Sequence, residues 1–248
     1  MPRYFLEVRY LGSRYNGFQI QDNAITIQSE IEKALHLRLR KPVSLTGSSR
    51  TDAGVHALQN YFHFDVEQEL RSDILYNLNA ILPADITVRN LIPVKPDAHC
   101  RFQALHRSYS YHLHTQKDPL RTDRSWYYPY AINPDTLQAV AQHLMGTHDF
   151  TSFSKRNTQV RTFVCTILQS EWEQTTEGLI YRVRANRFLR GMVRGLVGTM
   201  LQTARGRMDI NGFKEVIDAR DCTRADFTTP AHGLFLESVA YNWEEILR

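Results

Sequence analysis

The feature that most constrains the fold of this chain is the order of its strand-like and helix-like segments. In the first part of the 248 residues, a strand pattern is followed by a helix, two extended stretches, a second helix and a further strand. This strand-helix-strand-strand-helix-strand order is that of the ferredoxin-like fold. The order then returns in the second part, although no sequence repeat is visible. The chain is therefore predicted to be an α+β protein with two similar halves.

Hydrophobic periodicity defines the segments of the first half. Residues 3–10 alternate as a strand, and residues 26–37 have the spacing of an amphipathic helix. The predicted inward face of this helix consists of Ile27, Ile31, Ala34 and Leu35. The remaining segments are a short extended stretch at 42–46, a half-buried strand at 58–66, a helix near 72–80 and a strand at 86–94.

The second half contains the same kinds of segment. A strand at 108–114 precedes a helix that begins at Asn133 and Pro134, because proline favours the first turn of a helix. The segments predicted after it are strands at 161–172 and 179–187, a helix at 190–204 and a last strand at 234–241. We predict two ferredoxin-like (βαββαβ) halves, residues 1–103 and 104–248, with mainly antiparallel sheets joined around a central catalytic cleft.

Composition excludes several classes of protein. With 42% hydrophobic and 23% charged residues, the chain can bury a core and is neither disordered nor fibrous. No apolar run approaches the length of a membrane span, and the first residues lack the separate basic and apolar regions of a signal peptide. We expect a cytoplasmic protein that does not bind a membrane.

Residue types that bind metals form no complete site in the sequence. Cys100, Cys165 and Cys222 are too far apart for a zinc motif, and we expect them to be buried, reduced thiols. His112 and His114 share one face of a predicted strand, but no nearby acid or cysteine completes a site. We therefore expect no bound metal.

Basic residues are distributed unevenly along the chain. The net charge is only +4, yet residues 181–208 carry seven arginines and no acid. Two further acid-free tracts lie at 33–51 and 99–115, and the second includes Tyr109 and Tyr111. Arginines interleaved with aromatic rings suit RNA, whose bases stack and whose phosphates pair with cations. A solvated basic surface explains any single tract, whereas the three together favour an RNA partner.

The segment at 47–57, GSSRTDAGVHA, is a candidate site for chemistry. It lies between two predicted strands, is built of small residues and presents one carboxylate, Asp52, two positions after Arg50. Its glycines allow a tight turn and a close approach to a ligand. Asp52 is either a turn cap or a catalytic carboxylate, and composition does not choose between these interpretations.

The helix at 190–204 is a second candidate. Its apolar stripe contains two methionines, and its glycines at 191, 195 and 198 cluster on roughly the opposite side. Arg194 lies between the two sides, where it can reach into a cleft or extend from a core helix to solvent. Glycine is unfavourable inside a helix, so these glycines indicate a close backbone approach.

The 47–57 segment resembles the signature of the TruA-type tRNA pseudouridine synthases. Other blocks similar to that family follow in the same order and extend the resemblance over about residues 4 to 241. They are Tyr10–Gly12 through Tyr15–Gln19 with Thr26–Gln28, Leu78–Asn79 with Leu82–Ile86, Arg101–Phe102 with Tyr109–Tyr111, Gly146–Phe150 with Phe153, Phe188–Leu189 with Met192–Arg194, and Pro230–Ala231 with Gly233–Leu234. Two residues depart from the family pattern: Phe18 stands where many members have Trp, and Ser49 stands where many have Gly before the arginine. Neither departure removes a chemical group.

The resemblance implies a function. Members of the family isomerise uridine to pseudouridine at positions 38 to 40 of tRNA, in the anticodon stem-loop, without a cofactor. The resemblance further implies two α+β halves around a catalytic cleft and a homodimer that binds tRNA rather than DNA. A non-catalytic RNA-binding protein and an N-glycosidic hydrolase acting on nucleosides are the alternatives.

The resemblance also assigns roles to residues. Asp52 is the catalytic carboxylate, which attacks the ribose or removes a proton from it, and Arg194 holds it ionised. Tyr109 lies against the target base for stacking or proton transfer. Arg50 fills the place of the flipped base or contacts a phosphate. The arginines expected from their charge to contact the RNA backbone are Arg182, Arg184, Arg187, Arg205 and Arg207.

Overall fold

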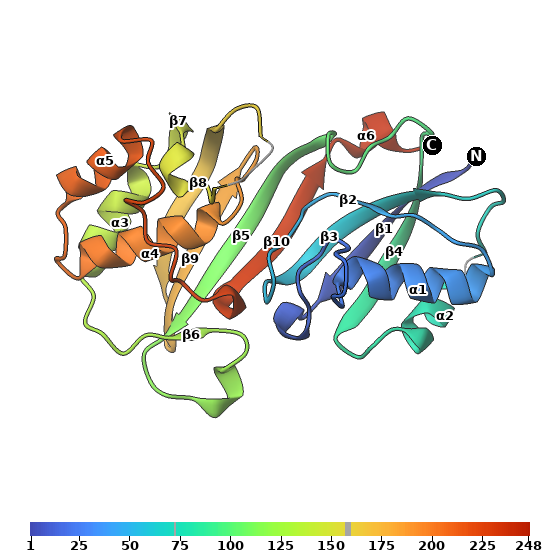
Figure 1. Ribbon diagram of the computed structural model, residues 1–248, viewed down its shortest axis with the longest axis horizontal. Coiled ribbons are helices and arrows are strands. Elements are labelled where there is room, and N and C mark those ends of the chain that lie inside the picture. The colour runs from blue at the N-terminus through green and yellow to red at the C-terminus, as the bar shows by residue number, and fades with distance from the viewer. Residues whose placement is uncertain (72, 157–159) are drawn as a thin grey trace. The chain divides into compact units, whose positions relative to one another are not determined.

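The computed structural model in Figure 1 describes residues 1–71, 73–156 and 160–248. Its contacts divide the chain into two compact units. Unit 1 contains residues 1–105 and 236–248, and unit 2 contains residues 106–235. The C-terminal residues from 236 onward, which we had assigned to the second half from the sequence, thus group with the first unit.

Unit 1 has the strand order of a ferredoxin-like half. Its elements are β1 (Arg3–Tyr10), α1 (Ile27–Leu39), β2 (Thr46–Gly47), β3 (His56–Asp65), α2 (Ile74–Ile81), β4 (Ile86–Val94), most of β10 (Leu234–Tyr241) and α6 (Trp243–Ile246). The sheet order is β4-β1-β3, with β2 and β10 both paired to β3. The pairings of β1 with β3 and β4, and of β2 with β3, are antiparallel. Figure 1 shows α1 and α2 together over one face of this sheet.

Strand β3 is buried on both faces. The sequence predicts a half-buried strand here, but Tyr61 and His63, which alternate with the apolar Phe62 and Phe64, are also buried. The ring centroid of Tyr61 lies 5.3 Å from that of Tyr241 and 5.8 Å from that of Trp243. The C-terminal segment of the chain therefore covers the face that alternation alone assigned to water.

Unit 2 is a second α+β unit. Its elements are β5 (Ala104–His114), β6 (Trp126–Tyr127), α3 (Pro134–Gln142), β7 (Gly146–Asp149), β8 (Val164–Gln174), β9 (Gly178–Ala185), α4 (Met192–Ala204) and α5 (Ile210–Asp218). The strand order is β5-β9-β8-β7 with antiparallel neighbours, and β6 adds to β5 in parallel. The predicted α+β class is confirmed. In the described part of the chain, no helix has the length and apolar character needed to cross a membrane.

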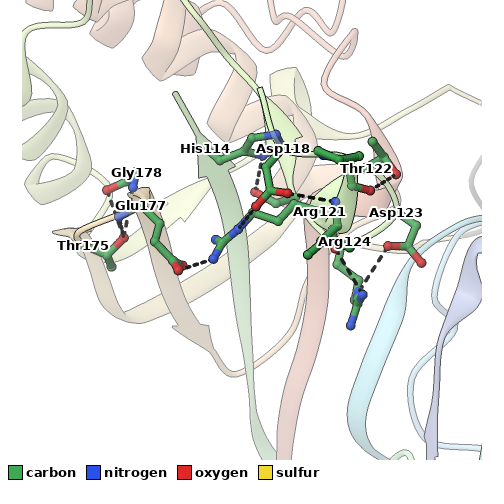
Figure 2. A network of polar contacts seen from close by, with 12 residues as sticks. His114, Asp118, Arg121, Thr122, Asp123, Arg124, Thr175, Glu177 and Gly178 are labelled. Carbon is green, nitrogen blue, oxygen red and sulfur yellow. Dashed lines mark hydrogen bonds and ion pairs between the residues drawn. The ribbon is translucent and has the colours of Figure 1, made fainter. Parts of the chain in front are cut away.

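A network of charged and polar contacts fixes the long connection between β5 and α3. Arg121, in a 3-10 turn at Pro119–Arg121, pairs through Nε with the carboxylate of Asp118 at 3.1 Å and through a terminal nitrogen with Glu177. Glu177 lies in the turn between β8 and β9, which Figure 2 shows beside the connection. The network therefore joins two loops of unit 2. Among the described residues, further 3-10 turns lie at Gly12–Arg14, Thr151–Phe153 and Ala231–Gly233.

Candidate active site

Asp52 lies on a loop between β2 and β3 in unit 1. Asn60 on β3 donates a 2.9 Å hydrogen bond from Nδ2 to the carbonyl oxygen of Ser49. The hydroxyl oxygens of Tyr10 and Thr51 are hydrogen-bonded at 2.8 Å. All four of these residues are buried. The residues just before Asp52 are therefore fixed to the central strands β1 and β3.

The segment at 12–18 packs against this loop. The backbone N–H of Phe18 donates to the carbonyl oxygen of Thr51 at 3.1 Å. Gly17 has a φ of +94°, and a Cβ there would lie 3.0 Å from the same oxygen. A side chain at this position would therefore be strained and crowded, which explains the glycine.

The carboxylate of Asp52 is partly exposed. The turn after it is closed by the backbone, because the N–H of Val55 donates to the carbonyl oxygen of Asp52 at 3.2 Å. Within unit 1, the described residues give the carboxylate itself no hydrogen bond or ion pair. An aspartate that caps a turn accepts hydrogen bonds through its side chain. The contacts therefore do not support the capping interpretation, and the carboxylate is available to a ligand.

In unit 2, the glycines of α4 admit a second segment close to the helix. A Cβ on Gly195 would lie 2.8 Å from the ring of Phe227, and one on Gly198 would lie 2.3 Å from the carbonyl oxygen of Asp226. Gly191 precedes the helix with a φ of +74°. The close backbone approach inferred from the sequence is therefore confirmed, and the approaching segment is 226–229.

Arg194 is anchored to the same segment. Its Nε donates a 2.7 Å hydrogen bond to the carbonyl oxygen of Thr229. Next to it, the hydroxyl of Tyr111 donates a 2.8 Å hydrogen bond to the carbonyl oxygen of Pro230. Burial raises the pKa of Tyr111, although the charge of Arg194 opposes this shift. Arg194 is therefore positioned by backbone contacts and does not simply extend from the helix to solvent.

Tyr109 and Tyr111 lie two residues apart on β5 but in different environments. Tyr111 is completely buried, whereas Tyr109 is partly exposed. The ring of Tyr109 meets the ring of Phe188 edge to face, with centroids 5.0 Å apart and an interplanar angle of 79°. Tyr111 is thus a core aromatic, and Tyr109 is the tyrosine with accessible surface.

The basic residues on and after β9 have unequal surroundings. Nε of Arg182 pairs with Glu173 at 2.9 Å. Nε of Arg184 is buried and has no hydrogen-bond partner among the described residues. Arg187 is half-buried, and burial raises the pKa of the nearby Cys165 thiol to about 11 against the opposing charge of this arginine. Arg184 is therefore the one of these three with an unsatisfied buried donor.

The two arginines after α4 also contact the protein. The guanidinium carbon of Arg205 lies 3.9 Å from the ring centroid of Tyr130, in cation–π geometry. Arg207 is exposed and donates to Oε1 of Gln202 at 3.1 Å. Arg50, in unit 1, is exposed beside Asp52. If Arg205 contacts RNA, it therefore does so with a guanidinium that is stacked on the Tyr130 ring.

The histidines considered for a metal site from the sequence have other partners. His112 Nε2 is hydrogen-bonded to Ser110 Oγ at 2.9 Å, and His114 Nδ1 is bonded to Ser125 Oγ at the same distance. The expectation of buried thiols is correct for two cysteines but wrong for Cys222, which is partly exposed in the turn after α5.

A different group, His63, His99 and Cys100, was missed because His63 lies 37 positions before Cys100 in the sequence. Their ligand atoms lie within 4.8 Å of one another. The Cys100 thiol donates to the carbonyl oxygen of Thr46 at 3.1 Å, however, and the charge of Arg3 lowers the pKa of both histidines in addition to burial. The hydrogen-bonded thiol and the nearby positive charge of Arg3 disfavour a bound cation, so we interpret the group as a packed polar cluster.

The comparison with known sequences decides the family. The profile described as tRNA pseudouridine synthase matches residues 7–103 and 140–242. The chain belongs to this family. Among curated relatives, tRNA pseudouridine synthase A of Parabacteroides distasonis is 42% identical over 97% of this chain and 96% of its own length. The protein of the same name from Azobacteroides pseudotrichonymphae is 41% identical over 98% of both chains, and that of Staphylococcus aureus is 37% identical over 99% of this chain and 93% of its own.

Membership of the tRNA pseudouridine synthase family confirms the predicted enzyme class, an isomerase that acts on uridine in tRNA. The residues predicted from the sequence lie in different units. Asp52 and Arg50 share one loop of unit 1, and Tyr109 and Arg194 lie on β5 and α4 of unit 2. Thr229 and Pro230, which hold Arg194 and Tyr111, are functional neighbours that sequence reasoning did not single out individually. Pro230 belongs to a block that the resemblance pointed out, whereas Thr229 lies outside it.

Proposed function

We propose that this enzyme converts uridine to pseudouridine at positions 38 to 40 of tRNA, in the anticodon stem-loop, with Asp52 as its catalytic carboxylate. The observation that carries the proposal is the Asp52 loop. In a chain of this family, a rigid loop presents a partly exposed carboxylate without a partner in its own unit. A fixed carboxylate of this kind suits nucleophilic or general-base chemistry.

The reaction needs only groups that the chain can supply. The bond between the ribose and N1 of uracil breaks, the base turns, and the ribose carbon joins C5. C5 then loses its proton, N1 gains one, and no atom is oxidised or reduced. Asp52 attacks the ribose or removes a proton from it. Arg194 keeps that carboxylate ionised and oriented, and Tyr109 stacks on the base or moves the C5 proton.

The proposal also includes the binding of the substrate. Arg50 occupies the space of the flipped uridine or contacts a phosphate, and Arg182, Arg184, Arg187, Arg205 and Arg207 contact the RNA backbone. We propose that the enzyme works in the cytoplasm as a homodimer.

The test uses tRNA labelled with tritium at C5 of uridine. Each turnover should release tritium to water, with EDTA present and no metal added, and chemical mapping of the product should place pseudouridine at positions 38 to 40. Release of free uracil would instead indicate the hydrolase, and tight binding without tritium release would indicate a non-catalytic RNA-binding protein. Loss of activity in EDTA, restored by a divalent ion without a change in tRNA folding, would contradict the proposed chemistry.

A further inference from the structure

Unit 1 contains a pocket that is separate from the Asp52 carboxylate. It has a volume of about 270 Å³ and is lined by the 45–47 segment, the 99–102 segment and neighbouring side chains. Two arginines, Arg50 and Arg101, line it, and its described lining includes no carboxylate. Asp52 is not among the lining residues. The pocket therefore attracts anions and does not hold the reacting uridine.

The floor of the pocket is rigid and aromatic. Phe18 lines it, is buried, and stacks on Phe62 with ring centroids 4.4 Å apart and an interplanar angle of 14°. A Cβ on Gly47 would lie only 1.9 Å from the Phe18 ring, so the glycine allows the ring to reach this position. The pocket is thus a preformed feature of the packed core beside the catalytic loop.

The rim of the pocket carries an exposed ring. Phe102 is 76% exposed. One side of it is supported by His99, whose ring centroid is 4.2 Å away at an interplanar angle of 34°. His99 in turn meets His63, with centroids 4.5 Å apart. Burial and the charges of Arg3 and Arg101 lower the pKa of His99, which favours the uncharged form of the ring that supports Phe102. A single exposed aromatic residue is common, but this one is held in place beside a cationic pocket.

We propose that this pocket binds an unpaired nucleotide of the RNA substrate other than the reacting uridine, with its base stacked on Phe102 and its phosphate near Arg50 and Arg101. The inference rests on the proposed function. Proteins recognise unpaired RNA by stacking its bases on aromatic side chains and pairing its phosphates with cations. An exposed aromatic ring and two arginines occur together at this pocket, whose floor is part of the packed core.

The test compares three variants of the full-length enzyme by filter binding to tRNA. Phe102→Leu removes the aromatic face but keeps an apolar side chain, and Phe102→Trp keeps a face for stacking. Tyr76→Leu is the matched control, because Tyr76 on α2 is 79% exposed in the same unit and does not line the pocket. Phe102→Leu should weaken binding at least about fivefold, the scale of one base stack, whereas Phe102→Trp and Tyr76→Leu should bind like the wild type.

Several results would overturn the proposal. These are wild-type affinity in Phe102→Leu, an equal loss in Tyr76→Leu, or no recovery in Phe102→Trp. A free mononucleotide is tested as a competitor at millimolar concentration. If adenosine 5′-monophosphate binds to the wild type but not to Phe102→Leu and leaves tRNA binding unchanged, the pocket is a free-nucleotide site and the assignment to substrate RNA is wrong. Tritium release by the wild type is measured in parallel, so failure of the pocket proposal is distinguished from failure of the proposed function.

Discussion

The hydroxyl of Tyr111 donates a 2.8 Å hydrogen bond to the carbonyl oxygen of Pro230, one residue after the carbonyl that accepts a 2.7 Å bond from Arg194. A core residue of β5 and a candidate active-site arginine on α4 therefore hold the same short segment. The position of Arg194 thus depends on buried packing as well as on its own helix, and Tyr111 acts on the site only through this support.

Replacing Tyr111 by phenylalanine keeps the buried ring and removes its hydrogen bond. We expect Tyr111→Phe to lower the free energy of unfolding by about 1 kcal/mol, the usual contribution of one such bond. Because its hydroxyl contacts the backbone, the rate of tritium release should stay near that of the wild type. Urea denaturation and single-turnover assays measure the two effects. A loss of rate on the order of 10²-fold with unchanged stability would place Tyr111 in the chemistry.

Tyr109 should behave in the opposite way. If its hydroxyl moves a proton, Tyr109→Phe should bind tRNA normally and lose at least about 10²-fold in single-turnover rate, since general acid–base groups contribute on this scale. The partly exposed ring makes Tyr109→Phe a mild structural change, which melting curves will verify. If Tyr109→Phe keeps nearly full rate while Tyr109→Leu does not, stacking is the role of the ring and the hydroxyl is dispensable.

Gly198 tests the fit between α4 and the 226–229 segment. A Cβ there would lie 2.3 Å from the carbonyl oxygen of Asp226, which is backbone and cannot rotate away. Gly198→Ala should therefore lower the free energy of unfolding by about 1 to 3 kcal/mol, as overpacking does. Gly212→Ala on α5 is the control, because its nearest neighbour would be a side-chain oxygen at 3.3 Å. Equal effects of the two variants in urea denaturation would show that the close contact between Gly198 and the 226–229 segment does not determine the stability.

The elements that the sequence predicted best are those with strong periodicity. β1 and β4 have the predicted bounds, and the four residues expected on the inner face of α1 are its buried residues. β7 was missed because its four residues, GTHD, show no apolar alternation. α5 left a signal that was overlooked, since Asp209 caps a helix with Phe213, Val216 and Ile217 on its buried face.

The partners of the site residues could not be predicted from local patterns. Composition singled out the loop of Asp52 and the helix of Arg194, but Thr229 is 35 positions from Arg194, and Pro230 is 119 positions from Tyr111. Contacts at these separations depend on how the elements pack. The same is true of Tyr61, which alternation assigned to solvent and the C-terminal residues cover.

His63 makes stability depend on pH. Burial and the charges of His99 and Arg3 lower its pKa from 6.5 to about 4. Between these values the unfolded chain binds a proton that the folded protein does not, so stability decreases as the pH falls through this window. The slope from this residue is at most about 1.4 kcal/mol per pH unit. His63→Asn, which does not titrate, should have a smaller slope in urea denaturation between about pH 7 and 5. An unchanged slope in His63→Asn would show that His63 does not cause this pH dependence of stability.

The most direct test of the account is single-turnover tritium release by Asp52→Asn at saturating enzyme. The substitution keeps the size of the side chain and removes its charge. Because no hydrogen bond within unit 1 depends on the carboxylate, the variant should melt like the wild type and bind tRNA with similar affinity. We predict a loss of at least roughly 10³-fold in rate, the scale for a central catalytic group. A folded variant that binds tRNA and retains more than about a tenth of the wild-type rate would show that Asp52 is structural.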